Sequence, residues 1–268
     1  MVALAYFGAD FSREFKDFRK VLNFRLQESG SETPVPRGEL VSKFALLSDT
    51  HSDTEMTKKA LAAAKNLGAQ YILHSGDWTT VGTIEELEEQ KHLFDQAALA
   101  YWGVPGDHDL WQSGLKNFRS VFGRPYESFD RSGVHHILLD TSDTDIGFGE
   151  AQLSWLKSDL AKTKLPTFIF THLPPYHPYS ARTVWEKGGQ NLEVKKQVDL
   201  FLQLVKGKVM AVFAGDHHFS ASYTEPSSGV KIVISGAVTS SRNLQEPRFN
   251  LVEVYESGDF KLTEVTIK

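Results

Sequence analysis

The chain has 268 residues, of which 41% are hydrophobic and 24% charged, a composition typical of a globular protein with one large or two small domains. Its formal charge of -5 excludes a strongly basic surface for holding nucleic acid by its phosphates, so no extended nucleic-acid partner is expected. The lack of cysteine excludes thiol catalysis, zinc–cysteine sites and disulfides.

The N-terminal segment predicts an extension rather than a membrane anchor. Residues 1–8 form an apolar run that stops at Asp10, and no later run approaches the roughly 18 apolar residues of a membrane span. We therefore expect a cytoplasmic protein, with an exported protein that has lost its signal as the alternative. Residues 10–28 carry apolar side chains at helical spacing and residues 29–38 are rich in turn formers. The predicted domains are a helical extension with a linker over 1–40 and a main domain over 41–268.

From residue 41 onward, short β-rich runs alternate with helical patterns. The runs 41–48, 70–75 and 100–105 are separated by helical patterns over 54–68 and 84–99, which is typical of β-α-β units in a largely parallel sheet. Ser52 with Glu55, and Thr83 with Glu86, predict capping boxes at the two helices. The last part of the chain is strand after strand, at residues 219–225, 230–236, 248–256 and 259–267. The fold class is therefore α/β, with a parallel-rich half followed by an antiparallel-rich half.

Five apolar strands end in acidic residues and histidines. The ends read FALLSDTH, YILHSGDW, YWGVPGDHD, TFIFTHLP and VMAVFAGDHH, and they carry Asp49, His51, Asp77, Asp107, His108, Asp109, His172, Asp216, His217 and His218. Because the carboxyl ends of strands in an open α/β sheet meet at one edge, these side chains are expected to cluster. One such residue alone is more simply a helix cap or a satisfied polar group, and that structural interpretation is preferred for His74, His92, His135 and His136.

A cluster of this composition requires cations. Packing so many carboxylates and imidazoles together without one would cost several kcal/mol in repulsion and desolvation. Carboxylate and imidazole ligands without sulfur suit Mn, Fe, Zn or a harder cation. Seven or eight ligands are too many for one ion, so the count favours two metal ions that share a bridging carboxylate.

The order of these motifs resembles the calcineurin-like metallophosphoesterase superfamily, in particular its purple-acid-phosphatase and cyclic-nucleotide-phosphodiesterase branches. The resemblance runs from about residue 42 to the C-terminus. It implies a four-layer α/β/β/α sandwich of two mixed sheets. It also implies a first metal site of Asp49, His51 and His218, a bridging Asp77, and a second metal site of Asp107, His172 and Asp216. In the implied mechanism a hydroxide between the metals attacks phosphorus, while His108 donates a proton to the leaving oxygen and Asp109 orients its ring.

Two positions depart from the usual family pattern. The family has Asn at the position of Asp107 and His at that of Asp216, and PhoD-type alkaline phosphatases resemble the chain at both motifs. Four carboxylates would nearly neutralise two divalent metals, so we expect Fe or Mn, with Mg or Ca possible at the second site, rather than Zn. A nearly neutral centre also favours a phosphodiester over a phosphomonoester. The alternative is an impaired second site in a protein that acts as a binding or scaffold protein.

Substrate contacts are expected from the loop over residues 172–191. The loop is rich in Pro, Tyr and Gly, and loops at the mouth of a site often set substrate choice. Tyr176, Arg182 and the neighbouring His217 are the substrate-binding candidates, with rim packing as the competing interpretation. The predicted function is metal-dependent hydrolysis of a small-molecule phosphoester, with no membrane partner.

Overall fold

The computed structural model describes residues 36–243 and 245–268, and within these ranges the strands form two mixed sheets. The first has the order β11-β10-β1-β2-β3 and the second β4-β5-β6-β7-β9-β8. The strands of the first are β1 (Leu40–Leu47), β2 (Tyr71–His74), β3 (Ala100–Gly103), β10 (Arg248–Tyr255) and β11 (Phe260–Thr266). Those of the second are β4 (Glu127–Arg131), β5 (Val134–Leu138), β6 (Thr167–Phe170), β7 (Ala211–Ala214), β8 (Ala221–Thr224) and β9 (Lys231–Ile234). The predicted helical extension lies outside the described residues, apart from its last few positions.

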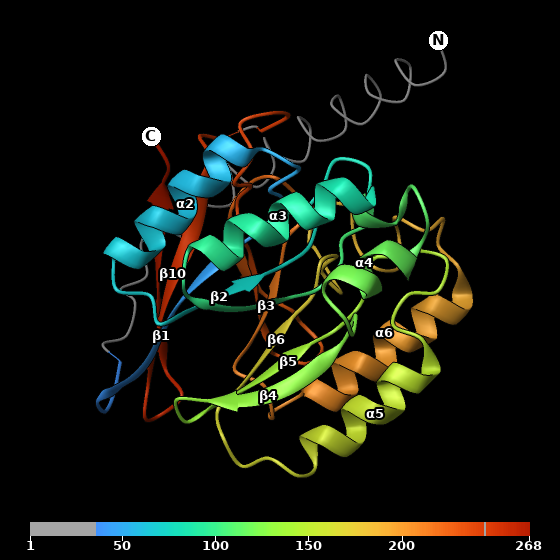
Figure 1. The fold of residues 1–268 in the computed structure, drawn as a ribbon. Helices are drawn as coiled ribbons and strands as arrows, with labels where there is room; N and C mark the ends of the chain where they lie inside the picture. The colour runs from blue at the N-terminus through green and yellow to red at the C-terminus, as the bar shows by residue number, and fades with distance from the viewer. Residues whose placement is uncertain (1–35, 244) are drawn as a thin grey trace.

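Helices cover the outer faces of the sheets, so the predicted α/β/β/α layering is confirmed (Figure 1). On the first sheet lie α2 (Thr54–Asn66) and α3 (Ile84–Gln96), with α4 (Leu115–Val121) beside α3. On the second lie α5 (Glu150–Leu160) and α6 (Leu192–Val205). None of the described helices is long and apolar enough to cross a membrane.

Alternation along β1 shows how the layers are built. Phe44 and Leu46 pack between the two sheets, whereas Ala45 and Leu47 pack under α2 and α3, and all four are fully buried. A strand that is buried on both faces reads as a continuous apolar run, because successive side chains point to opposite faces. The other predicted parallel strands have the same apolar character for the same reason.

The predicted capping box is present at the start of α3 but absent at the start of α2. Thr83 and Glu86 form the predicted capping box of α3. The expected box of Ser52 with Glu55 does not form, because Asp53 is the N-cap of α2 and accepts a hydrogen bond from the amide of Met56. Asp53 also binds the amide and hydroxyl of Ser240, so it ties α2 to the loop before β10.

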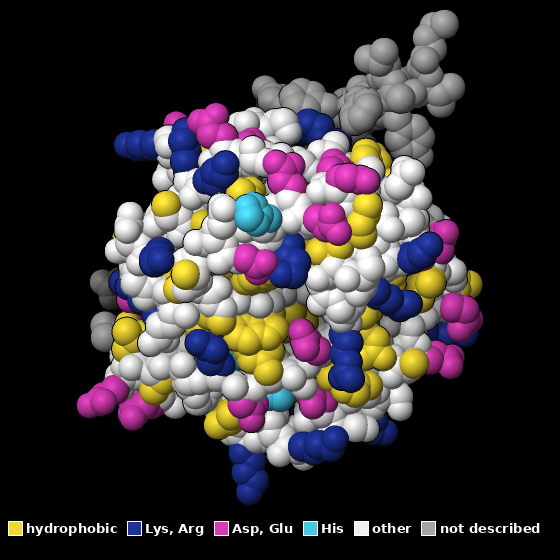
Figure 2. Space-filling model, viewed as in Figure 1, with side chains coloured by type: hydrophobic (Ala, Val, Ile, Leu, Met, Phe, Trp, Pro, Cys, Tyr) yellow, Lys and Arg dark blue, Asp and Glu magenta, His cyan; other side chains and the backbone are white. Residues whose placement is uncertain are grey.

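The parallel strands of both sheets end at the same edge of the molecule. β1, β2 and β3 run parallel in the first sheet, and β5, β6, β7 and β9 run parallel in the second. The amide of Asp216, after β7, donates to Asp49, after β1, at 3.2 Å, so the two sheets touch at this edge. Away from it, Figure 2 shows Lys, Arg, Asp and Glu side chains interspersed across the face formed by α2, α3 and α4.

Candidate metal centre

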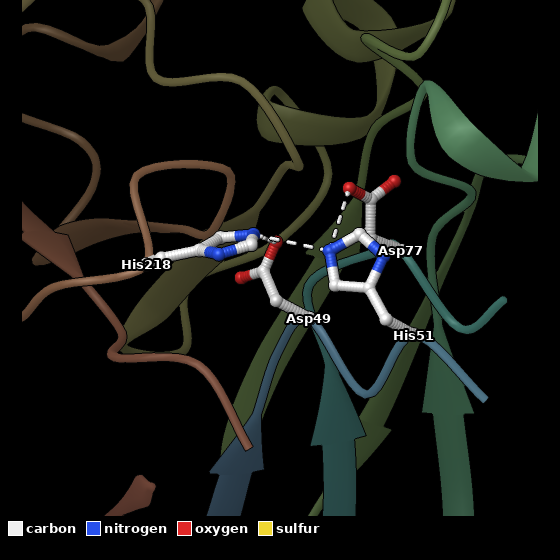
Figure 3. A group of neighbouring side chains, drawn as sticks. All are labelled: Asp49, His51, Asp77 and His218. Carbon is white, nitrogen blue, oxygen red and sulfur yellow. Dashed lines mark hydrogen bonds and ion pairs between the residues drawn. The ribbon is translucent and has the colours of Figure 1, made fainter. Parts of the chain in front are cut away.

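Four of the predicted ligands meet at the edge shared by the sheets. The ligand atoms of Asp49, His51, Asp77 and His218 all lie within 4.8 Å of one another, and all four residues are buried. Figure 3 shows their polar groups pointing toward a common point above the strand ends. Nε2 of His51 lies 3.0 Å from Nε2 of His218 and 3.5 Å from Asp77. The four residues have the arrangement expected of a metal site.

Left-handed backbone conformations turn these side chains inward. Such conformations are uncommon outside glycine and cost about 1–3 kcal/mol each where the surroundings impose them. Five predicted ligands have positive φ angles between 43° and 67°: Asp49, His51, Asp77, Asp216 and His218. Strain concentrated on the residues that converge indicates that the fold holds them in place for a function.

Two glycines of the motifs are required by close packing. A Cβ on Gly106 would lie 2.0 Å from Oδ1 of Asp77, and one on Gly215 would lie 1.9 Å from the hydroxyl of Ser48. Neither contact is possible for a side chain, so these positions accept only glycine without movement of the site. The glycines preceding the acidic residues thus allow the strand ends to approach one another.

Backbone carbonyls fix the orientation of the histidine rings. Nδ1 of His218 donates to the carbonyl oxygen of Arg242 at 3.0 Å, and Nδ1 of His172 donates to that of Ser75 at 2.8 Å. In both rings this places the other nitrogen, Nε2, toward the carboxylates. A carbonyl that accepts the remote N–H is the usual second partner of a metal-binding histidine.

The first group of residues fits a cation. Oδ2 of Asp49 is buried and accepts no hydrogen bond from the described residues. Burial lowers the pKa of His51 to about 3, so its ring is neutral and keeps a lone pair for a metal ion. Burial raises the pKa of Asp49, but the hydrogen bond to His218 and the charges of His218 and His172 together bring it below its usual value, so the carboxylate is ionised. Two carboxylates and two imidazoles without sulfur suit Mn, Fe or Zn.

A second group shares Asp77 with the first. The ligand atoms of Asp77, Asp107 and His172 lie within 4.8 Å of one another. Nε2 of His172 is 3.1 Å from Asp107 and 3.4 Å from Asp77. Burial lowers the pKa of His172, but the charge of Asp77 and hydrogen bonds to both carboxylates raise it well above the usual value.

Asp216 lies beside this second group but is engaged by basic side chains. Arg182 donates to both of its carboxylate oxygens, at 2.9 and 3.0 Å. Lys187 lies 2.6 Å from Oδ1 of Asp216 and 3.0 Å from Oδ1 of Asp107. The two acidic departures from the family pattern are therefore the two residues that contact Lys187.

His108 lies against the first group, as expected of a proton donor. Its ring is 4.6 Å from that of His51 and stacks on Trp111 at 3.9 Å. Its Nδ1 donates to the carbonyl oxygen of Thr80 at 2.7 Å, and its Nε2 lies 3.3 Å from a guanidinium nitrogen of Arg242. The orienting role expected of Asp109 is thus taken by the carbonyl of Thr80.

Asp109 has a different position. Its carboxylate accepts from the amides of Gly106, Trp78 and Thr79 at 2.9 to 3.2 Å and from the hydroxyl of Thr79 at 2.7 Å. It is fully buried. Asp109 therefore binds the loop after β3 to the loop after β2, which holds Asp77 and His108 in register.

The substrate candidates make contacts inside the loop over 172–191. His217 donates from Nε2 to the carbonyl oxygen of Arg182 at 2.7 Å and is 1% exposed, so it holds the loop. Tyr176 packs against the apolar core under α5 and α6, and its carbonyl accepts from Tyr223. Arg182 binds Asp216 as described above. The three residues shape the loop around the second group.

Two residues at the centre, Lys187 and Arg242, were not identified from the sequence, whereas Trp111 lies near the ligands in the sequence as well. Lys187 had a signal, since two extra carboxylates need compensating charge and the loop that follows β6 contains both Arg182 and Lys187. Arg242 lies in the loop before β10, and nothing in its local sequence distinguishes it from a surface arginine. Trp111 is 54% exposed and follows the motif of His108 by three positions.

Comparisons with known proteins agree with this geometry. Residues 43–257 match the model of the calcineurin-like phosphoesterase superfamily domain. A 3',5'-cyclic-nucleotide phosphodiesterase from Nostoc sp. is 28% identical over 196 residues, which cover 70% of this chain and 73% of that protein. The crystal structure of a dimetal phosphatase from Danio rerio has a TM-score of 0.66 at 15% identity and covers 86% of this chain and 100% of its own.

A purple acid phosphatase from yellow lupin, Lupinus luteus, shares the fold with a TM-score of 0.63 at 12% identity. The match covers 87% of this chain and 53% of the lupin protein. The family model spans most of the chain and includes all the strands that deliver the clustered carboxylates and histidines. The chain belongs to the calcineurin-like phosphoesterase superfamily, whose members are hydrolases of phosphoric esters.

Proposed function

We propose that the protein hydrolyses a phosphodiester of a small organic molecule at a metal ion held by Asp49, His51, Asp77 and His218. The observation that carries the proposal is the convergence of these four buried side chains, with two imidazole nitrogens 3.0 Å apart. A cation there would supply charge stabilisation for the phosphoryl oxygens and a water of lowered pKa. The donor set favours Mn or Fe over Zn in our proposal.

The residues around the ion have distinct tasks. His218 and His51 present lone pairs, and Asp77 faces both groups of ligands. His108 has Nδ1 held by Thr80 and Nε2 beside Arg242, and with a second proton on Nε2 the ring would donate that proton to the leaving oxygen. The guanidinium of Arg242 beside it stabilises negative charge on that oxygen.

A diester is favoured over a monoester for two reasons. The Nostoc relative is named a cyclic-nucleotide phosphodiesterase, and it matches the greater part of this chain. In addition, Asp49 and Asp77 would neutralise one divalent ion, and Asp107 and Asp216 are balanced by Lys187 and Arg182, so a centre without excess positive charge suits the single charge of a diester better than the two charges of a monoester. The exposed ring of Trp111 suits an organic substituent.

A paired assay tests the proposal. Metal-free protein is supplied in turn with Mn²⁺, Fe²⁺, Mg²⁺, Ca²⁺ and Zn²⁺ and assayed with bis(p-nitrophenyl) phosphate and p-nitrophenyl phosphate. We expect turnover that requires Mn²⁺ or Fe²⁺ and favours the diester, and loss of turnover in Asp77→Asn. If the wild type turns over substrate no faster than Asp77→Asn with every metal, the proposal that the protein is an enzyme is wrong. That result would support the alternative, a binding or scaffold protein.

A further inference from the structure

The loop between β6 and α6 places two basic side chains among the carboxylates of the second group. Lys187 bridges Oδ1 of Asp107 and Oδ1 of Asp216, at 3.0 and 2.6 Å. Arg182 pairs with both oxygens of Asp216. The side chain of Lys187 is 25% exposed and that of Asp216 is 1% exposed, so the ion pairs are largely shielded from water.

The ammonium contacts oxygens that a second metal ion would need. Oδ1 of Asp107 lies 3.1 Å from Nε2 of His172, and Oδ1 of Asp216 lies 3.8 Å from it, so these are the carboxylate atoms that face the histidine. Lys187 is bound to both of these oxygens. A divalent ion on the same atoms would lie within a few ångströms of a fixed positive charge in a poorly solvated site, where like charges repel strongly.

The identity of the two acidic residues follows from this contact. A neutral amide or imidazole at either position gives a metal ion a ligand but gives an ammonium no opposite charge. Asp107 and Asp216 each give Lys187 a carboxylate, and Asp216 also pairs with Arg182 through both of its oxygens. The negative charges of Asp107 and Asp216 are therefore balanced by two basic side chains without a metal ion. In the group of Asp49, His51, Asp77 and His218, the two carboxylates have no lysine or arginine partner among the contacts described above.

We propose that the ammonium of Lys187, supported by Arg182, takes the place of the second metal ion, so that the protein binds one metal ion per chain. The inference rests on the proposed function only in taking Asp49, His51, Asp77 and His218 as the metal site. Lys187 then supplies the positive charge on the far side of Asp77, where a phosphoryl oxygen can contact it.

Metal stoichiometry tests this inference without any assay of turnover. Metal-free protein is loaded with excess Mn²⁺, freed of unbound ions by gel filtration and analysed by mass spectrometry for metal per chain, with electron paramagnetic resonance to detect coupled ion pairs. We expect one uncoupled ion in the wild type and in Lys187→Arg. In Lys187→Met we expect the stoichiometry to double, because the ammonium is gone and Asp77, Asp107 and His172 can then bind a second ion.

The matched control is Lys196→Met, which removes an exposed lysine of α6 that pairs with Glu193. It is expected to bind one ion. Two coupled ions in the wild type would overturn the inference, and this result does not depend on whether Lys187→Met folds. A single ion in a folded Lys187→Met protein would overturn the claim that the ammonium excludes the second ion. One bound ion without phosphodiester turnover would contradict the proposed function alone, whereas two ions with turnover would contradict this inference alone.

Discussion

Nε2 of His51 and Nε2 of His218 lie 3.0 Å apart, although the residues are separated by 167 positions in the chain. Nδ1 of His218 donates to the carbonyl oxygen of Arg242, so Nε2 of the ring faces His51. The two imidazoles in this arrangement can share a cation, and the carboxylates of Asp49 and Asp77 on either side supply the negative charge.

Removing one of these imidazoles should weaken metal binding. For His218→Ala we expect the affinity for Mn²⁺ to fall by at least about 100-fold, since loss of a ligand exceeds the 10- to 100-fold effect of losing an outer hydrogen-bond partner. Isothermal titration calorimetry of metal-free protein with Mn²⁺ measures this affinity. His92→Ala, on the exposed side of α3, is the matched control and should bind as the wild type does. Equal affinity in both variants would contradict the metal site.

His108 should affect the chemical step rather than metal binding. In His108→Asn we expect kcat for a diester to fall by about 10²- to 10⁴-fold, the usual contribution of a positioned proton donor. The fall should be larger for a phenyl ester than for a p-nitrophenyl ester, because the better leaving group needs less protonation. Unchanged Mn²⁺ affinity is the control, and an equal loss with both esters would contradict proton donation.

Gly106 tests the packing of the strand ends. In Gly106→Ala the new methyl group would lie 2.0 Å from Oδ1 of Asp77, so that carboxylate has to move. We expect loss of tight Mn²⁺ binding with a folded core. Gly68→Ala is the comparison, since its Cβ meets nothing within 4 Å and only its backbone is strained. If Gly106→Ala binds Mn²⁺ as tightly as Gly68→Ala does, the position of Asp77 is not critical.

His136 should make stability depend on pH. Burial lowers its pKa from 6.5 to about 3, so between these pH values the unfolded state binds a proton that the folded state does not. Stability then rises with pH through this window and is lost as pH falls, by up to about 1.4 kcal/mol per pH unit. His136→Phe keeps the stacking on Phe129 but loses the hydrogen bond with Tyr71.

Urea unfolding at pH 7 and pH 5 checks this. The His136→Phe variant should be less stable than the wild type at pH 7 but should lose less stability on going to pH 5. If the free energy of unfolding falls equally between pH 7 and pH 5 in the variant and the wild type, the pKa of His136 does not differ between the folded and unfolded states.

Local order in the chain predicted the parallel strands and the gathering of carboxylates and histidines at one edge, whereas the four layers and the grouping of these residues into two metal sites were implied by the family resemblance. Apolar runs buried on two faces identify the parallel strands, and the residues after them must meet at one edge. Thr83 and Glu86 were predicted as a capping box from spacing alone. Ser52 was not the cap of α2, because Asp53 competes for the same role one position later.

The second group could not be predicted fully, because its partners come from the path of a loop. Spacing places Asp107 and Asp216 after their strands, but it says nothing about which side chains of residues 172–191 return to them. Lys187 is 80 positions from Asp107 in the chain, and only the folded loop brings them into contact. The same holds for Arg242, whose carbonyl and guanidinium contact two different histidines.

The meeting of two sheets at one edge has a mechanical consequence. Asp49, His51 and Asp77 follow strands of the first sheet, whereas His218 follows a strand of the second. An ion bound by all four residues would therefore cross-link the two sheets. An ion that binds only the folded protein adds about 2.7 kcal/mol at a free concentration of 100 times Kd. Chelation should therefore lower the Tm. The contacts between the two sheets should weaken first, while the hydrogen bonds between strands within each sheet stay intact.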